Sequence, residues 1–391
     1  MAKKQVKTKR KSAFITPKVE IKQISQTRKD IASWQRAIRM TNLQDNPKYW
    51  YLQQLFDNIS LDALFTSQYK NRELKTLSEP PVLRKPNGEI DEKQTEMLQN
   101  AQWVYELNRA IFESRFRGYS LIELSFDADD NLQISFVPRT NIDPKGGFVY
   151  PDYTDDKKIN YRKLPEYGTW ILEFIDKSEP YGLMNKLVPH VLFKRFAQSS
   201  YSELCEIYGI PPRVLKTDVA DPEALNRGKE MMENMGRAAW LIIDENEEFN
   251  FAAGVATNGD VYTNLVNLCN NEISMLVSGA IIGQDTKHGN RSKEESSQEI
   301  LQELINSDWQ FIKQQWKAVI IPALRRIGVI TGDVQYDYQA KENLDELWTM
   351  TTQALPYYDV DPQWIKDKFG IEVQAKRSQA GQPLSADDFF D

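Results

Sequence analysis

The sequence predicts an α+β fold that combines several long helices with a small antiparallel sheet. Apolar residues recur every three or four positions over several long stretches, which is the period of amphipathic helices. Two shorter stretches alternate apolar and polar residues on either side of a turn, which is typical of a β-hairpin. The composition, 41% hydrophobic and 27% charged, is that of a folded globular protein, and 391 residues suffice for two or three domains.

The first 180 residues predict a helical base with a sheet. Residues 28–77 and 92–116 have helical periodicity, and the prolines of "SEPPVLRKPNGEID" separate them. Gly118 ends the second helix. The stretches "YSLIELSF" and "LQISFVP" flank the turn "DADDN" and predict a hairpin, and "GGFVY" and "TWILEFI" predict further strands.

The middle of the chain predicts two long helices on either side of a small αββ insert. Residues 181–209 form one long helical pattern, which Gly209 ends. Residues 222–239 predict a helix, and "AAWLIID" and "FNFAAG" predict two strands around the turn "ENEE". Residues 261–282 predict the second apolar helix.

The longest predicted element is a helix over residues 295–328. Its apolar residues recur at three or four positions throughout. Pro322 lies inside it, lacks an N–H group and clashes with the carbonyl of Ala318, so we expect a kink there.

The segment "SGAIIGQDTKHGNRSKEESS" raises the question of a nucleotide site. A phosphate-binding loop of the Walker type has the pattern G-x-x-x-x-G-K-[ST]. Five residues separate Gly283 from Gly289, and Asn290 occupies the position of the lysine, so the spacing argues against such a site. Two alternatives remain: a solvated connector between helices, or a loop whose cations contact nucleic acid.

Composition and motifs also argue against several other classes of protein. The net charge of −7 is not that of a general polyanion binder. Cys205 and Cys269 lie far apart, which indicates a reducing compartment and no structural zinc site. Neither His190 nor His288 has a partner at metal-ligand spacing. No stretch reaches the ~18 apolar residues of a membrane span. We expect a structural protein with no catalytic residue, metal or cofactor.

The two ends of the chain differ in charge. Residues 1–29 contain ten Lys or Arg and the single acid Glu20, which predicts a solvated basic arm. The last residues are punctuated by Gly and Pro and end in "DDFFD", which predicts a flexible acidic tail.

Several stretches, in the same order along the chain, resemble the portal proteins of tailed bacteriophages, specifically the family of Mu-like prophages. They are "DIASWQRAIRMTNLQDNPKYWYLQQLFDNISLDALFTSQYKNRE", "GLMNKLVPHVLFKRFAQSSYSELCEIYGIPPRVLK", "ISMLVSGAIIGQDT", "NSDWQFIKQQWKAVIIPALRRIG" and the segments "QYDYQAKENLDELWTM" and "WIKDKFGIEV". The resemblance covers roughly residues 28–373.

The resemblance implies a portal-type fold. Its parts would be a basic flexible arm (1–27), an α/β wing (28–180), a stem helix (181–209), a clip (210–258), a second stem helix (259–283), a tunnel loop (284–294), a long kinked helix (295–328), a C-terminal wing or crown segment (329–375) and a flexible acidic tail (376–391).

The resemblance also implies a function. A portal protein forms a ring, typically of twelve copies, at the capsid vertex of the virion after assembly in the host bacterial cytoplasm. The ring is the channel for packaging and ejection of double-stranded DNA. Its partners would be other copies of itself, the major capsid protein, the large terminase subunit, a head–tail adaptor and DNA of any sequence, without a membrane. Portal proteins are not enzymes.

Specific residues follow from these assignments. The DNA-contacting loop would use Lys287, His288, Asn290, Arg291 and Lys293, and the clip would dock the motor and adaptor through Arg213, Lys216, Glu245 and Glu247. Subunits would pack along the stem through Leu183, Phe193, Tyr208, Leu265, Ile273, Leu276 and Ile281, and Pro322 would kink the long helix. Two other functions remain as alternatives: a head–tail adaptor without a channel, and a DNA-packaging ATPase, which would require the missing Walker loop.

Overall fold

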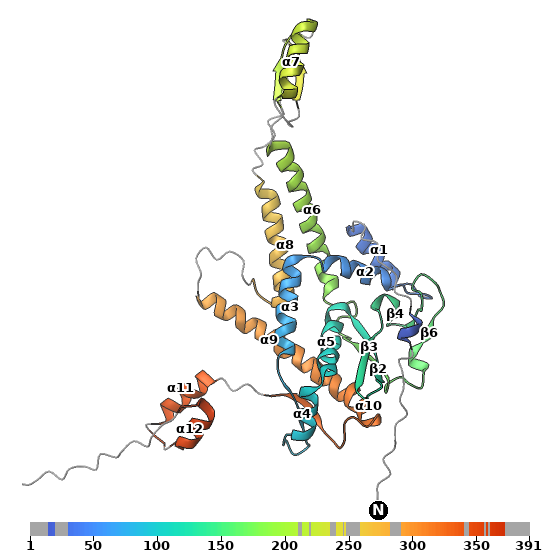
Figure 1. Ribbon diagram of the computed structural model, residues 1–391, viewed down its shortest axis with the longest axis vertical. Helices are drawn as coiled ribbons and strands as arrows, with labels where there is room; N and C mark the ends of the chain where they lie inside the picture. The colour runs from blue at the N-terminus through green and yellow to red at the C-terminus, as the bar shows by residue number, and fades with distance from the viewer. Residues whose placement is uncertain are drawn as a thin grey trace, which may run out of the picture. The chain divides into compact units, whose positions relative to one another are not determined.

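The computed structural model describes residues 15–19, 30–209, 213–218, 220–234, 240–244, 246–247, 259–281, 291–339, 344–355, 357–358 and 360–371. The chain divides into two compact units, Met1–Asp337 and Tyr338–Asp391. Both helices and antiparallel strands are present, so the predicted α+β class is confirmed (Figure 1).

The N-terminal helical region consists of three helices, α1 (Ile31–Thr41), α2 (Trp50–Ile59) and α3 (Ala63–Leu77), instead of the continuous pattern expected over 28–77. Asp30 and Asp62 explain two of the boundaries, because their side chains accept the N–H groups of Ser33 and Phe65 and so begin α1 and α3. The helix expected over 92–116 is likewise two helices, α4 (Glu92–Asn100) and α5 (Gln102–Arg117), since the backbone is extended at Ala101.

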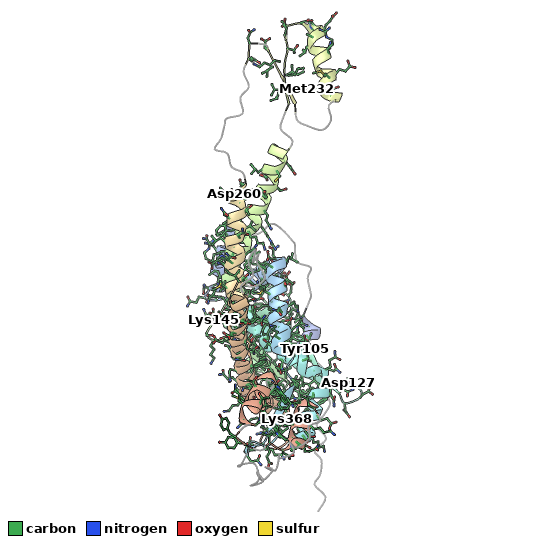
Figure 2. The ribbon with its side chains drawn as sticks, turned by 90° about the vertical axis from the view of Figure 1, so that its left-hand side faces the viewer. Tyr105, Asp127, Lys145, Met232, Asp260 and Lys368 are labelled. Atoms are coloured by element: carbon green, nitrogen blue, oxygen red, sulfur yellow. The ribbon has the colours of Figure 1, made fainter. Side chains whose placement is uncertain are left out.

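The main sheet has three antiparallel strands, with β2 (Tyr119–Phe126) between β3 (Leu132–Phe136) and β7 (Ile171–Ile175). In register, Ile122 lies opposite Phe136 on one side and opposite Leu172 on the other. The predicted hairpin is therefore confirmed. Its turn is organised by Asp127, labelled in Figure 2, whose carboxylate accepts backbone N–H groups of the turn.

Short strands complete this unit. The strands β4 (Ile142–Asp143), β5 (Phe148–Val149) and β6 (Ile159–Asn160) form a second antiparallel sheet, and β1 (Pro81–Arg84) pairs with β10 (Gln335–Tyr338). One apolar core joins the two three-stranded sheets, and it consists of Ile15, Tyr49, Tyr119, Leu121, Val137, Ile142, Val149, Tyr161 and Ile171.

Part of the expected flexible arm is folded, which corrects the prediction for residues 15–19. Ile15 is fully buried in the core between the sheets, and Thr16–Lys18 form a 3₁₀ turn. The buried carboxylate of Glu123 accepts the backbone N–H groups of Ile15 and Thr16 and the Thr16 hydroxyl. These bonds satisfy the carboxylate, so the segment and the sheet stabilise each other.

Two long helices, α6 (Met184–Gly209) and α8 (Asp260–Ser278), pack side by side (Figures 1 and 2). They share one apolar core with α1, α2, α3 and α5. Its buried members are Ala37, Leu52, Leu55, Phe56, Ile59, Phe65, Phe112, Phe116, Met184, Leu187, Val188, Val191, Leu192, Ile273 and Val277.

The insert between these helices contains β8 (Arg213–Lys216), α7 (Pro222–Asn234) and β9 (Trp240–Ile243). The strands are parallel, so the described part of the insert is a βαβ unit, whereas an αββ order was expected. The first strand was missed because its four residues are too few to show an alternating pattern. The expected strand "FNFAAG" lies outside the described residues.

The long C-terminal helix starts earlier than expected. It comprises α9 (Arg291–Gln315), a π-helical turn (Trp316–Ile320) and α10 (Ile321–Arg326). The N–H group of Ile321 donates to the carbonyl of Trp316, five residues back, immediately before Pro322. The disruption expected near Pro322 thus takes the form of a π turn.

The second unit contains α11 (Leu344–Ala354) and α12 (Pro362–Phe369). The rings of Trp348 and Trp364 both pack edge-on against Phe369. This aromatic cluster holds the two short helices together.

The entry to α6 requires a glycine at position 182. Its φ of +75° is left-handed, and a Cβ atom there would lie 2.2 Å from the carbonyl oxygen of Phe116. We expect Gly182→Ala to lower the free energy of unfolding by about 3 kcal/mol, because an overlap with backbone adds to the strain of a left-handed alanine. Gly332→Ala is the matched control, since Gly332 has a φ of +73° and open space around it, and it should cost only about 1 kcal/mol. If urea unfolding shows the same loss of unfolding free energy in both variants, close packing at Gly182 is not the cause.

Candidate functional site

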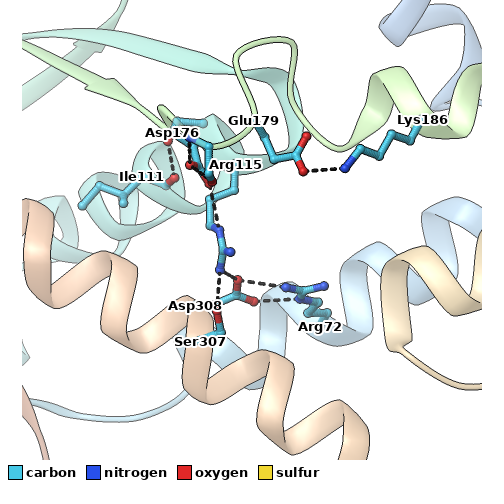
Figure 3. Close-up of polar contacts among 10 residues, drawn as sticks. Arg72, Ile111, Arg115, Asp176, Glu179, Lys186, Ser307 and Asp308 are labelled. Carbon is cyan, nitrogen blue, oxygen red and sulfur yellow. Dashed lines mark hydrogen bonds and ion pairs between the residues drawn. The ribbon is translucent and has the colours of Figure 1, made fainter.

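A buried cluster of four charged residues connects α8 and α9, the helices on both sides of segment 282–290. It consists of Arg72, Arg115, Asp176 and Asp308 and is called the joint below. The carboxylate of Asp308 on α9 accepts two hydrogen bonds from Arg72 on α3, at 2.7 Å from Nε and 2.9 Å from Nη2 (Figure 3). Both side chains are almost completely buried. A bidentate pair of this kind fixes the orientation of both partners.

Arg72 also reaches the end of α8. Its Nη1 donates to the backbone carbonyl of Val277 at 2.8 Å. The last carbonyls of a helix have no partner within the helix, so a guanidinium there satisfies a free acceptor and favours the negative end of the helix dipole. One side chain therefore holds α3, α8 and α9 together.

A second arginine completes the joint. Arg115 on α5 donates through Nη1 to Asp308 at 2.5 Å and through Nε to Asp176 at 3.4 Å (Figure 3). Two guanidinium groups thus face two carboxylates, Asp176 and Asp308. This balance allows the four charges to remain in a largely buried position.

The joint is reinforced by close packing at Gly279, one residue beyond α8. Gly279 has a φ of +75°, and a Cβ atom there would lie 2.6 Å from Ile300 and 3.1 Å from Leu304 on α9. The end of α8 and the first part of α9 are therefore in contact.

The helix α6 is fixed to the α2–α3 junction by a second buried pair. The Nζ atom of Lys194 lies 2.8 Å from the Asp62 carboxylate, and both side chains are buried. Arg195 donates to the side-chain and backbone oxygens of Asn58 at 2.7 and 2.8 Å. Asp62 also begins α3, so one carboxylate determines both the start of α3 and the position of α6.

The expected DNA-contacting loop lies largely outside the described residues. This applies to Lys287, His288 and Asn290, and to the side chains of Arg291 and Lys293. The backbones of Arg291 and Lys293 belong to the first turn of α9, which corrects the expected loop end at residue 294. Arg, Lys and Glu are good helix formers, and acids in a first turn favour the helix dipole, so "RSKEE" extends the helix.

The expected clip residues are only partly placed. Lys216 ends β8 and is exposed. Glu247 is also exposed, and its carboxylate accepts the N–H group of Asp244 at 3.1 Å. Glu245 and the side chain of Arg213 lie outside the described residues.

The expected stem residues divide into two groups. Ile273 is completely buried in the chain's own core, and Leu183 and Leu276 pack against that core. Ile273 therefore has no surface left for a neighbouring copy, which corrects its assignment to subunit packing. Phe193 and Ile281 are exposed, Leu265 is half-buried, and the side chain of Tyr208 lies outside the described residues.

The exposed apolar residues of the stem form a different set. Val261, Leu268 and Met275 are spaced seven apart on α8 and are 65%, 56% and 52% exposed. A seven-residue spacing keeps them on one face of the helix. Phe193 and Phe196 are exposed on α6. Phe196 and Met275 were not among the residues expected to be exposed on these helices. The sequence of each helix has apolar residues on a second face, and that pattern could have identified them.

The described residues contain neither a metal-binding cluster nor a membrane-spanning helix. Among the described residues, no group of three or more His, Cys, Asp or Glu side chains could hold a metal ion. In the same part of the chain, no helix is both long and apolar enough to cross a membrane.

Comparison with known proteins identifies the family. The family model of the portal protein of Mu bacteriophage matches residues 53–371, well over half of the chain. The chain belongs to the Mu-type portal protein family. The portal protein of Escherichia phage Mu is 23% identical over 297 residues, which are 71% of this chain and 57% of that protein. The chain thus spans a little over half the length of this relative.

One solved structure supports the fold, and a second has a lower similarity. A chain from the neck of an empty GTA particle, computed with C6 symmetry, has a TM-score of 0.52 at 13% identity, over 86% of this portal-family chain and 98% of that one. An HK97-family phage portal protein from Corynebacterium diphtheriae has a TM-score of 0.39 at 10% identity, over 78% and 97% of the two chains. The first likeness supports the portal-type fold.

We expect a conservative substitution at Asp308 in the joint to lower the stability of the fold strongly. Asp308→Asn removes one buried negative charge, which leaves Arg115 with Asp176 alone and leaves the buried Arg72 without its carboxylate partner. We expect a loss of about 3–5 kcal/mol in the free energy of unfolding. Asp333→Asn is the control, because Asp333 forms an exposed ion pair with Arg325 and should change stability by under ~1 kcal/mol. Urea unfolding curves with equal midpoints for the two variants would refute the role of the joint.

Proposed function

We propose that this chain assembles into a closed ring at a capsid vertex and that the ring is the channel through which double-stranded DNA enters and leaves the head. Membership of the portal family supports this function. The observation that carries it is the apolar surface left exposed on both long helices, α6 and α8, after the chain's own core is complete.

A ring requires each copy to present complementary surfaces to two neighbours. Val261, Leu268 and Met275 on α8, together with Phe193 and Phe196 on α6, would supply the apolar part of these contacts. Burying such side chains contributes ~1.5–3 kcal/mol each. Twelve copies, the number typical of portal rings, are part of this proposal.

The segment between α8 and α9 would face the DNA. It carries Lys287, Arg291 and Lys293, and phosphate contacts from such cations are independent of base sequence, as a moving duplex requires. The overall charge of −7 would prevent the rest of the ring from adhering to DNA. A solvated connector without DNA contacts is the alternative for this segment.

The βαβ insert would be the docking site for the terminase motor and later for the head–tail adaptor. It is a small unit between the two long helices, and it presents Lys216 and Glu247 to solvent. The wing would contact the major capsid protein. In this proposal the protein has no enzymatic activity, and the ATPase belongs to the motor.

The first functional prediction concerns the ring. The double substitution Leu268→Asp and Met275→Asp should abolish or strongly reduce ring formation, because it places two charges in an apolar subunit contact. The chain itself should stay folded, since both residues are exposed in one copy. Sedimentation velocity measures the rings, and circular dichroism measures the fold.

Leu74→Asp is the control for this variant, because Leu74 is 59% exposed on α3, outside the two stem helices. Its rings should form normally. If the stem variant also assembles normally, the exposed face of α8 is not a subunit contact.

The second functional prediction concerns the loop. Replacement of Lys287, Arg291 and Lys293 together by Ala should leave ring yield unchanged but produce heads that package poorly or lose DNA. The defect should vary with ionic strength, because screening weakens phosphate contacts. Packaging and retention like wild type at every salt concentration would support the solvated connector.

A further inference from the structure

A small pocket at the α2–α3 junction has no part in the proposed channel. Its volume is about 360 Å³, and its lining comes from α3, α5 and the start of α6. Phe65, Phe116 and Met184 contribute an apolar floor, and Tyr69, Lys70 and Arg109 are among the polar residues of the wall.

The wall is rich in hydrogen-bond donors. The Tyr69 hydroxyl has no hydrogen-bond partner among the described residues. The Nε atom of Arg109 donates to Glu113 at 2.9 Å and lies 3.5 Å from the Glu73 carboxylate, and its two terminal nitrogens donate to no described residue. Arg109 is also 46% exposed, so a ligand can reach it. The donors on Tyr69 and Arg109 suit a ligand that supplies acceptors.

Glu113 holds two arginines of the pocket, Arg139 and Arg109, in place. Arg139 donates to Glu113 at 2.6 Å and to the Tyr119 carbonyl at 3.0 Å, which fixes its position. Burial alone would raise the pKa of Glu113, but the guanidinium groups of Arg139 and Arg109 lower it below its usual value. Glu113 therefore remains ionised and orients both arginines.

Tyr69 remains a donor at physiological pH. Burial, with added repulsion from the carboxylates of Glu113 and Glu73, raises the pKa of Tyr69 well above its usual value. A protonated phenol can donate its O–H to a carboxylate, whereas a phenolate has no proton to donate.

We propose that this pocket binds an acidic peptide of a partner protein, with an aromatic side chain on the apolar floor and a neighbouring carboxylate on Tyr69 and Arg109. The volume holds one aromatic side chain and a carboxylate, and the arginine fork matches a carboxylate in geometry.

The local charge distinguishes this ligand from DNA. The pocket is lined by four cations, Lys70, Arg109, Arg117 and Arg139, and by one acid, Glu113. Lys70 and Arg117 are in turn paired with Glu73 and Asp57. The surplus of cations is therefore small, which suits one or two carboxylates better than a polyanion, and the apolar floor offers nothing to a phosphate backbone.

The test uses a synthetic probe peptide, GDDFDG, labelled with fluorescein and titrated with the full chain while fluorescence anisotropy is measured. We expect saturable binding that Tyr69→Phe and Arg109→Met each weaken about tenfold, because each removes a hydrogen bond to a charged group. The probes GNNFNG and GDDADG, amidated at the C-terminus like GDDFDG, should bind much more weakly, since the first lacks carboxylates and the second lacks the aromatic ring.

Arg325→Met is the matched control, because Arg325 lies outside the pocket and its loss should leave binding unchanged. Tyr69→Phe keeps the packed ring and should keep the wild-type melting temperature, so it decides the question even if Arg109→Met destabilises the fold. The proposal is overturned if the probe does not bind, or if it binds the two pocket variants as well as wild type. It is also overturned if a duplex DNA binds with the same dependence on Tyr69 and Arg109.

Discussion

The arrangement of the long helices depends on one buried carboxylate, Asp308. Arg72 and Arg115 reach it from α3 and α5, and Arg72 also binds the last turn of α8. Apolar packing alone is non-directional and tolerates sliding of helices, whereas a bidentate pair with a third partner permits one arrangement. The contact between Gly279 and Ile300 depends on the same arrangement, since a small shift of α9 would separate them.

Each long helix has two apolar faces with different uses. On α8, Ile273 and Val277 face the core of the chain, whereas Leu268 and Met275 remain exposed. The Lys194–Asp62 pair fixes which face of α6 is turned inward, and the hydrogen bond from Arg72 to the Val277 carbonyl positions the end of α8. These charged contacts therefore determine which apolar surface stays exposed, and in the proposed ring that surface meets the neighbouring copies.

The sequence predicted the elements with strong local signals and missed those that depend on distant partners. The β2–β3 hairpin and the disruption near Pro322 were predictable, because turn residues and proline act locally. The boundary between α2 and α3 depends on the cap Asp62, which the apolar period conceals. Ile273 was assigned to the wrong surface, because periodicity indicates that a face is buried without indicating what covers it.

The joint itself could not be found from the sequence. Arg72 and Asp308 lie 236 residues apart, and each looks like an ordinary charged residue on an amphipathic helix. The same holds for the folded segment at Ile15, whose burial depends on Glu123 in the middle of β2. Both cases involve a charge that is buried only because a distant segment supplies its partner.

Native-state hydrogen exchange of Arg72→Met tests most directly whether this joint holds the helices together. If it does, amides in the last turn of α8 and around Asp308 in α9 should exchange faster together in the variant, while the β2–β3–β7 sheet keeps its protection. The opposite result, faster exchange confined to α3 with α8 and α9 protected as in wild type, would show that apolar packing alone fixes these helices.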